Sequence, residues 1–164
     1  MDYRTAPRSV CFFVTMLWLL SACGPSQATI DLSYSARDGD LEGVESLLER
    51  GTDPNAYNDV GTTALMAAAS QGNVAVMDLL FEAGADATIL TENGDSALMV
   101  VANGSGSVGA AELLIERGAD PCVELSDWIR DLLGVETMVD LARRGENTEY
   151  IDFIQDVGEE CHPP

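Results

Sequence analysis

The amino-acid sequence predicts an all-α repeat solenoid of about four repeats. A segment occurs twice: "GTTALMAAASQGNVAVMDLLFEAGAD" runs from Gly61 to Asp86, and "GDSALMVVANGSGSVGAAELLIERGAD" runs from Gly94 to Asp120. The opening glycines are 33 residues apart, a period that is typical of stacked repeats. Apolar residues in each copy recur at helical spacing. Because one such unit cannot bury its own apolar face, we expect neighbouring copies to stack.

Two weaker copies flank this pair. Upstream, "ARDGDLEGVESLLERGTDPN" places Gly51 33 residues before Gly84. Downstream, "ETMVDLARRGENTEYIDFIQDVG" gives a fourth copy, in which Thr137 takes the place of Thr63 and Ser96. Terminal repeats of a solenoid cover the ends of the stack and are often degenerate. We therefore interpret the outer copies as caps.

The first helix of each central copy has a clear start and a buried face. Thr63 and Ser96 are placed to cap its N-terminus, since a hydroxyl there accepts from a free backbone N–H. Leu65 and Ala68 are expected to face the neighbouring repeat, where alanine lets helices approach closely.

The second helix follows a break at Gly72. Its apolar residues recur at helical spacing. Three of them are predicted to face the core: Val76, Leu79 and Leu80. Gly84 and Gly118 are placed to end this helix in the left-handed conformation.

The period and these motifs resemble the ankyrin repeat, with its Thr-Pro-Leu-His start, central alanine pair and Gly-Ala-Asp end. The resemblance covers nearly all of the chain from Ile30 to Gly158. It implies helix-turn-helix units joined by β-hairpin-like fingers. It also implies a protein-binding surface made from the fingers and the exposed positions of the inner helices.

This chain departs from the ankyrin pattern at several positions. Ala64 and Ala97 replace the proline, while Met66 and Met99 replace the histidine. The hydrogen-bond network that the histidine supplies must therefore be missing or replaced by packing. Asp140 takes the same place in the fourth copy, which makes that copy the least regular.

The start of the chain predicts a signal peptide. Arg4 and Arg8 lie in a short polar stretch, and Val10 to Leu20 is apolar apart from Thr15. This run is too short to cross a bilayer, which needs about 20 residues, but it suits the core of a signal peptide. A buried N-terminal helix is the alternative.

The end of this segment, "LSAC", resembles the lipobox of bacterial lipoproteins. The resemblance implies lipid on the Cys23 sulfur, cleavage before Cys23 and acylation of the new amino group. Several acyl chains make a firm anchor. Gly24, in place of the aspartate that often retains such proteins at the inner membrane, favours the periplasmic side of the outer membrane. In a single-membrane organism the anchor leaves the protein on the cell surface.

Three parts are therefore expected in the chain. Residues 1–22 form the signal peptide, and residues 23–29 form the lipidated cysteine with a flexible tether, "GPSQAT". Residues 30–164 form one ankyrin-repeat domain, expected to be a monomer.

The chain is strongly acidic, with 28 aspartates and glutamates, eight arginines and a net charge of −20. This charge excludes nucleic acid as a partner, because binding rests on neutralising phosphates. It also disfavours anionic lipid headgroups, so the membrane is contacted through the lipid anchor only. Two interpretations of the acidity stay open: solubility, or steering of a basic protein partner.

The sequence does not predict an enzyme, a cofactor or a metal site. "GSGSVG", Gly104 to Gly109, has the form of a dinucleotide-binding turn, but the preceding "ALMVVA" aligns with "ALMAAA", which is a helix in the repeat register. His162 is the single histidine and lies near the C-terminus. That removes the usual catalytic base and the commonest metal ligand.

Cys122 and Cys161 are predicted to form a disulfide. They lie three or four residues after glycines that are equivalent in adjacent repeats, Gly118 and Gly158, and an oxidising periplasm favours their pairing. Free thiols are the alternative, because stacked repeats could hold the two positions too far apart.

The ankyrin resemblance implies the binding residues. Those of the fingers are Tyr57, Asn58, Asp59, Ile89, Leu90, Glu92 and Asn93, and those of the groove are Ser70, Gln71 and Asn103. Trp128 lies in a longer third connection, either as an interface anchor or as a plug over the last repeat. For the finger residues, packing between neighbouring fingertips is the alternative.

Two functions compete for such a module. One is a scaffold or accessory factor for a periplasmic or membrane protein, and the other is an immunity-type inhibitor of a secreted toxin.

Overall fold

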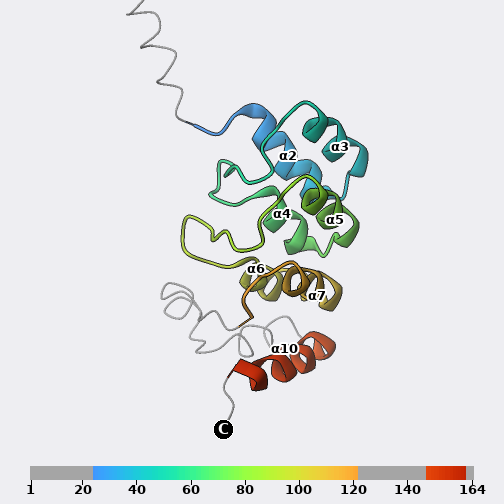
Figure 1. Ribbon diagram of the computed structural model, residues 1–164, viewed down its shortest axis with the longest axis vertical. Coiled ribbons are helices and arrows are strands. Elements are labelled where there is room, and N and C mark those ends of the chain that lie inside the picture. Colours follow the sequence, from blue (N-terminus) through green and yellow to red (C-terminus); the bar gives the residue numbers. More distant parts are fainter. Residues whose placement is uncertain (1–23, 122–146, 162–164) are drawn as a thin grey trace, which may run out of the picture.

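A computed structural model describes residues 24–121 and 147–161 of the chain. These ranges hold seven α-helices and no β-strand. The helices are α2 (Gln27–Asp38), α3 (Leu41–Glu49), α4 (Ala64–Gln71), α5 (Val74–Glu82), α6 (Ala97–Asn103), α7 (Val108–Glu116) and α10 (Thr148–Cys161). Helices α2 to α7 stack as three pairs along one long axis, and α10 lies at the end of the stack, against α7 (Figure 1). The predicted all-α repeat solenoid is confirmed.

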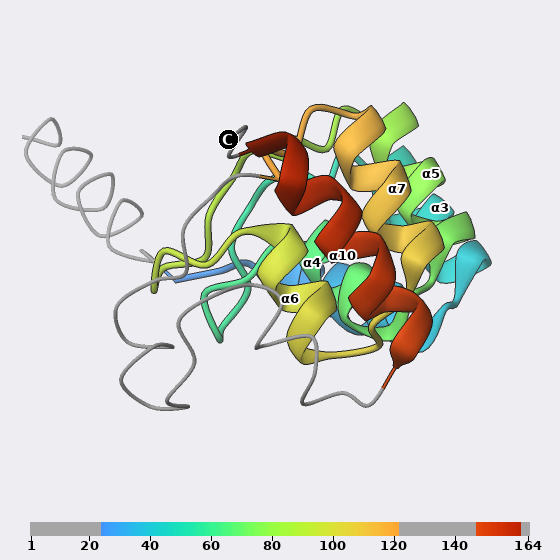
Figure 2. The same ribbon diagram turned by 90° about the horizontal axis from the view of Figure 1, so that it is seen from below.

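The stack has two layers of helices. The inner layer contains α2, α4 and α6, and each of them packs against the next. The outer layer contains α3, α5, α7 and α10, again in sequential contact. Seen from the end of the stack, the inner helices lie between the outer helices and the connecting loops (Figure 2). The exposed side of the inner layer therefore lies beside these loops.

The predicted caps of the inner helices are present. The Thr63 hydroxyl accepts from the Met66 N–H at 3.4 Å, and the Ser96 hydroxyl accepts from the Met99 N–H at 3.3 Å. Gly72 ends α4 with φ 73°, in the left-handed region. Each hydroxyl cap contributes about 1 kcal/mol to helix stability.

The core runs through the stack between the two layers. Leu65 and Ala68 of α4 are buried, as predicted, and so are Met66 and Met99. The two methionines occupy the positions of the family's histidine, so apolar packing replaces the histidine network in both central copies.

The outer helices also follow the prediction. Val76 and Leu80 are buried, and half-buried Leu79 packs against the same core. Gly84 and Gly118 have φ 91° and 98°. Both residues therefore end their helices in the predicted left-handed conformation.

Polar contacts join one repeat to the next. Asn73, which precedes α5, donates from Nδ2 to the carbonyl oxygens of Ala36 and Arg37 at 3.1 and 2.7 Å. Asn147, which precedes α10, donates in the same way to the Gly106 carbonyl at 2.9 Å. These bonds satisfy carbonyl groups that would otherwise lack a partner where an inner helix ends or turns.

The first helix begins earlier than predicted. We expected residues 23–29 to be a tether, but α2 begins at Gln27. The Ser26 hydroxyl accepts from the Thr29 N–H at 3.1 Å, and Thr29 is buried. The tether prediction rested on the small, polar composition of this stretch. The serine cap nevertheless starts a helix here, because the residues that follow it tolerate a helix.

The glycine-rich segment that begins at Gly104, which has the form of a dinucleotide-binding turn, is a turn between α6 and α7. The residues before it form α6, as the repeat register predicted, and Gly106 turns the chain with φ 58°. The Ser107 hydroxyl then caps α7 by accepting from the Ala110 N–H at 3.3 Å. The segment is thus the interhelix connection of an ankyrin repeat.

Helix α10 supplies the outer helix of the fourth copy. It continues past Gly158 to Cys161, so this glycine does not end a helix as Gly118 does. Several predicted features lie outside the described residues: the signal peptide, Cys23, Cys122, Trp128, Thr137, Asp140, His162 and the side chain of Cys161. Of the helices that are described, none combines the length and apolar character needed to cross a bilayer.

Candidate functional site

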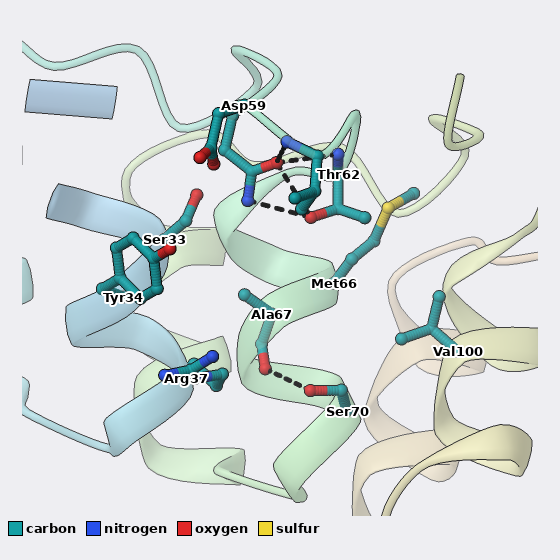
Figure 3. Close-up of a pocket in the computed structure, with 11 residues that line it drawn as sticks. Ser33, Tyr34, Arg37, Asp59, Thr62, Met66, Ala67, Ser70 and Val100 are labelled. Atoms are coloured by element: carbon teal, nitrogen blue, oxygen red, sulfur yellow. Dashed lines mark hydrogen bonds between the residues drawn. The ribbon is translucent and has the colours of Figure 1, made fainter. Parts of the chain in front are cut away.

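A pocket of about 200 Å³ opens on the exposed side of the inner layer (Figure 3). We call it the groove pocket. One wall is the first finger, the loop of residues 51–63 between α3 and α4. The inner helices α2, α4 and α6 supply the other lining residues. Its place matches the surface that the ankyrin resemblance implies for binding.

Side-chain size along one register position creates this pocket. Tyr34, Ala67 and Val100 are 33 residues apart in turn and occupy equivalent places on α2, α4 and α6. All three line the pocket. Because Ala67 is much smaller than its neighbours on either side, a hollow remains above α4.

The base of the pocket contains an unsatisfied polar group. Ser33 is 4% exposed, and its Oγ has no hydrogen-bond partner among the described residues. Its register equivalents on the next inner helices are Met66 and Met99, whose thioethers are at best weak acceptors. A buried hydroxyl without a partner costs about 1–3 kcal/mol.

The rim is apolar and exposed. Val60, in the first finger, is 70% exposed, and Tyr34 is 47% exposed. Both are unusually open for large apolar side chains, and both line the pocket. Exposed apolar residues that gather at one concavity are typical of a protein-binding surface.

A network at Asn58 holds this rim in place. Asn58 Oδ1 accepts from the Val60 and Thr62 N–H groups, both at 3.0 Å. Asn58 Nδ2 donates to Thr62 Oγ1 at 3.0 Å, and the Asn58 N–H donates to the Thr62 carbonyl at 2.9 Å. The side chain predicted to bind a partner is therefore committed to shaping the finger that carries Asp59 and Val60.

The pocket is lined by two charged residues, Arg37 and Asp59, and only Arg37 has an ion-pair partner among the described residues. The Arg37 guanidinium lies 3.4 Å from an Asp38 carboxylate oxygen and 5.0 Å from the centre of the Tyr34 ring. Asp59 makes no hydrogen bond or ion pair with the part of the chain that the structure describes. The positive group is thus partly neutralised, while the negative group is available.

The fingertips contact one another. The Tyr57 hydroxyl donates to the Leu90 carbonyl at 2.7 Å, and these residues are 40% and 42% exposed. Ile89 is half-buried against the core. The Glu92 N–H donates to the Gly61 carbonyl at 3.0 Å. Tyr57 thus contacts the next finger, as in the alternative of packing between fingertips, while the Leu90 side chain stays exposed.

The remaining predicted residues divide between the pocket and the open surface. Ser70 lines the pocket, and its hydroxyl donates to the Ala67 carbonyl at 2.8 Å. Gln71, Asn93 and Asn103 are exposed and lie outside the lining. Of the predicted binding residues that are described, the pocket brings together Asn58, Asp59 and Ser70.

Sequence reasoning did not assign the other lining residues to a binding site: Ser33, Tyr34, Arg37, Val60, Thr62, Met66, Ala67 and Val100. The repeat register contains a signal for two of them. Counting back 33 residues from Ala67 and Ser70 leads to Tyr34 and Arg37.

Comparisons with known proteins agree with this architecture. The family profile of ankyrin repeats (three copies) matches residues 32–124, more than half of the chain. The chain is 35% identical over 112 residues, 68% of its length, to the ankyrin repeat and KH domain-containing protein mask-1 of Caenorhabditis elegans. It is 42% identical over 62 residues, 38% of its length, to the mitochondrial disaggregases of Bos taurus and Homo sapiens.

These relatives are much longer proteins. The chain spans 4% of the nematode protein and 9% of each disaggregase. The profile match, the two-layered stack of helix pairs and the finger loops together place this chain in the ankyrin-repeat family.

Proposed function

We propose that this protein is an exported, lipid-anchored ankyrin module that holds a partner protein in the groove between its inner helices and fingers. Ankyrin repeats point to a protein–protein interaction module. The observation that carries the proposal is the groove pocket, whose rim exposes Tyr34 and Val60 beside a finger fixed by Asn58. A rigid rim lowers the entropy cost of binding, because little has to be ordered when the partner arrives.

The protein acts as a scaffold or accessory factor, without chemistry of its own, for a periplasmic or membrane protein. The "LSAC" sequence at Cys23 supports the anchored location. Within the described residues, Arg37 and Asp59 are the only charged groups that line the groove pocket, and no histidine or cysteine joins them. That composition suits recognition of a protein surface better than acid–base or nucleophilic catalysis.

Photocrosslinking in living cells tests the groove. A photoreactive amino acid at Val60 should capture one predominant partner, whereas the same amino acid at Ala83, exposed in the outer layer, should not. The double variant Tyr34→Ala, Val60→Asp, with a crosslinker at Thr62, should reduce capture at least about tenfold, or about 1.4 kcal/mol. Equal capture from both faces of the solenoid would contradict a groove-centred function.

The anchor has its own prediction. Cys23→Ala should leave the protein unprocessed or release it from the membrane fraction, because the lipid-bearing sulfur is lost. Metabolic labelling with a fatty acid analogue should mark the wild-type protein and not the variant. Ser21→Gly, which leaves the cysteine intact, serves as the control. A freely soluble, unlabelled wild-type protein would remove the anchor from the proposal while leaving the groove intact.

A further inference from the structure

We propose that the groove pocket receives the side chain of an arginine or lysine from a basic segment of the partner protein. This inference rests on the proposed function and specifies the chemistry of the partner. Three features of the pocket support it: its oxygen atoms, its charge and its size.

Two oxygen-bearing groups from different parts of the chain line the pocket. Ser33 comes from α2 and Asp59 from the first finger, and the Ser33 hydroxyl points toward the Asp59 carboxylate (Figure 3). The Ser33 Oγ has no hydrogen-bond partner among the described residues. The Asp59 carboxylate is likewise unpaired within them. Oxygen acceptors at one place suit a guanidinium or ammonium group, which carries only donors.

The surroundings of these oxygens favour a cation over an anion. Arg37 lines the same pocket, but Asp38 lies 3.4 Å from it. Asp38 partly neutralises Arg37, whereas Asp59 makes no ion pair with the described residues, so the negative group is the more available of the two. The whole chain carries −20, a field that attracts a basic segment and repels an acidic one. The presence of Arg37 in the lining therefore does not reverse the preference for a cation.

The pocket holds one side chain. Its volume of about 200 Å³ is below the range of about 300–1,000 Å³ that is usual for small-molecule sites. Val60 and the Tyr34 ring form apolar walls. The methylene stem of a lysine or arginine packs against such walls while its charged end reaches polar groups. The Tyr34 ring also attracts cations, and the Arg37 guanidinium lies 5.0 Å from its centre.

Capped amino acids test this inference on the full chain, purified in detergent and labelled for NMR. The probes are N-acetyl-arginine methylamide, its uncharged analogue N-acetyl-citrulline methylamide, and N-acetyl-glutamate methylamide. The arginine probe should shift the amide signals of Ser33, Asp59 and Val60 in a saturable way. The citrulline probe should bind at least about fivefold more weakly, and the glutamate probe should leave these signals unmoved.

Matched variants separate the pocket from general acidity. Asp59→Asn keeps the shape of a residue that makes no hydrogen bond in the described structure. It should weaken binding of the arginine probe at least about fivefold. Glu49→Gln removes an exposed carboxylate of α3, in the outer layer, and should change nothing. Equal weakening by both variants, or binding of the glutamate probe in place of the arginine probe, would overturn the inference.

Crosslinking of the partner through Val60, in the wild-type protein and in the Asp59→Asn variant, separates the two proposals. If the photoreactive amino acid at Val60 captures a partner, and captures it equally well when Asp59→Asn is also present, the inference of a basic side chain is wrong and the groove function stands. If the arginine probe binds at Asp59 and no partner is captured through Val60, the pocket chemistry is right and the groove function is wrong.

Discussion

Tyr150 links the last described helix to the core. It is fully buried, and its hydroxyl lies 3.5 Å from the Leu98 carbonyl, a long and weak hydrogen bond. Burial raises the pKa of this phenol well above its ordinary value of 10.0, because the phenolate loses its hydration in an apolar interior. A single residue therefore couples the stability of the last repeat to alkaline pH.

The sign of this coupling follows from proton binding. Above pH 10.0, the ordinary pKa of tyrosine, the unfolded chain releases the Tyr150 proton while the folded chain retains it. The free energy of unfolding should fall as the pH rises through this region. Urea titrations from about pH 8 to about pH 11 should show this loss of stability. In Tyr150→Phe the loss at high pH should be smaller, while the free energy of unfolding at neutral pH should be about 1 kcal/mol lower than in the wild-type protein.

Tyr34→Phe provides the matched control, since Tyr34 is 47% exposed. It should leave the alkaline loss of stability as it is in the wild-type protein. If Tyr150→Phe left the pH dependence unchanged as well, other groups would be responsible for the alkaline behaviour.

At the scale of an element, the first finger behaves as a small rigid unit. Asn58 joins the two ends of its tip, and Asn55 bridges to the second finger through the Gly84 carbonyl and the Asp86 N–H, both at 2.9 Å. The Thr88 hydroxyl and N–H both donate to the Asp86 carboxylate and lower its pKa. Each finger is thus held by short polar side chains together with backbone hydrogen bonds of the loops, and the described residues of the fingers contain no strand.

Asn58→Ala tests whether this rigidity serves binding. The substitution removes the acceptor of the Val60 and Thr62 N–H groups, so the rim should loosen while the helices remain. We expect unchanged helical circular dichroism, faster amide exchange at Val60 and Thr62, and partner capture reduced at least about fivefold. Asn93→Ala, in the second finger and outside the pocket, is the control. Unaltered exchange at Val60 would show that the network does not hold the rim.

The same scale shows why sequence reasoning succeeded with the helices and only partly with the site. Thr63, Ser96 and the left-handed glycines act through bonds within a few residues, so their roles can be read locally. The groove pocket depends on Tyr34 and Ala67, which stand side by side only after the repeats are stacked. The first copy is also degenerate at its start, where α2 begins at Gln27.

For the finger residues the sequence left two interpretations open, for a related reason. Tyr57 and Ile89 have no core task in the sequence of their own repeat. Tyr57 bonds instead to the next finger, through the Leu90 carbonyl at 2.7 Å, and Ile89 packs against the core. Contacts between repeats decided their places, and a single copy carries no signal for such contacts.

At the scale of the whole molecule, acidic residues form two rows along the outer layer. One row occupies equivalent positions at Glu45, Asp78, Glu112 and Asp152, and the other at Glu49, Glu82, Glu116 and Asp156. Arg117 is the one described cation that pairs with either row, at 3.2 Å from Asp78. Its guanidinium also lies 4.8 Å from the centre of the Phe81 ring.

Repulsion along these rows predicts a dependence of stability on salt. Sodium chloride should raise the thermal midpoint, because it screens like charges on neighbouring outer helices. Arg117→Ala should lower the midpoint more at low salt than at high salt. Since the pair is exposed, the loss in free energy of unfolding should be less than about 1 kcal/mol. Arg50→Ala, on an arginine that forms no ion pair within the described ranges, is the control. A midpoint independent of salt would contradict significant repulsion.

The early start of α2 limits how far a lipidated Cys23 could hold the solenoid from the bilayer. Only Gly24 and Pro25 separate Cys23 from Ser26, the residue that caps the helix. Three residue steps extend to at most about 11 Å, little more than the screening distance of about 8 Å at physiological salt. An anchored molecule would therefore have a very short linker between its lipid and its first helix. Its first repeat, and the groove pocket beside it, would lie at the membrane surface, within reach of partners embedded there and beyond reach of those deeper in the periplasm.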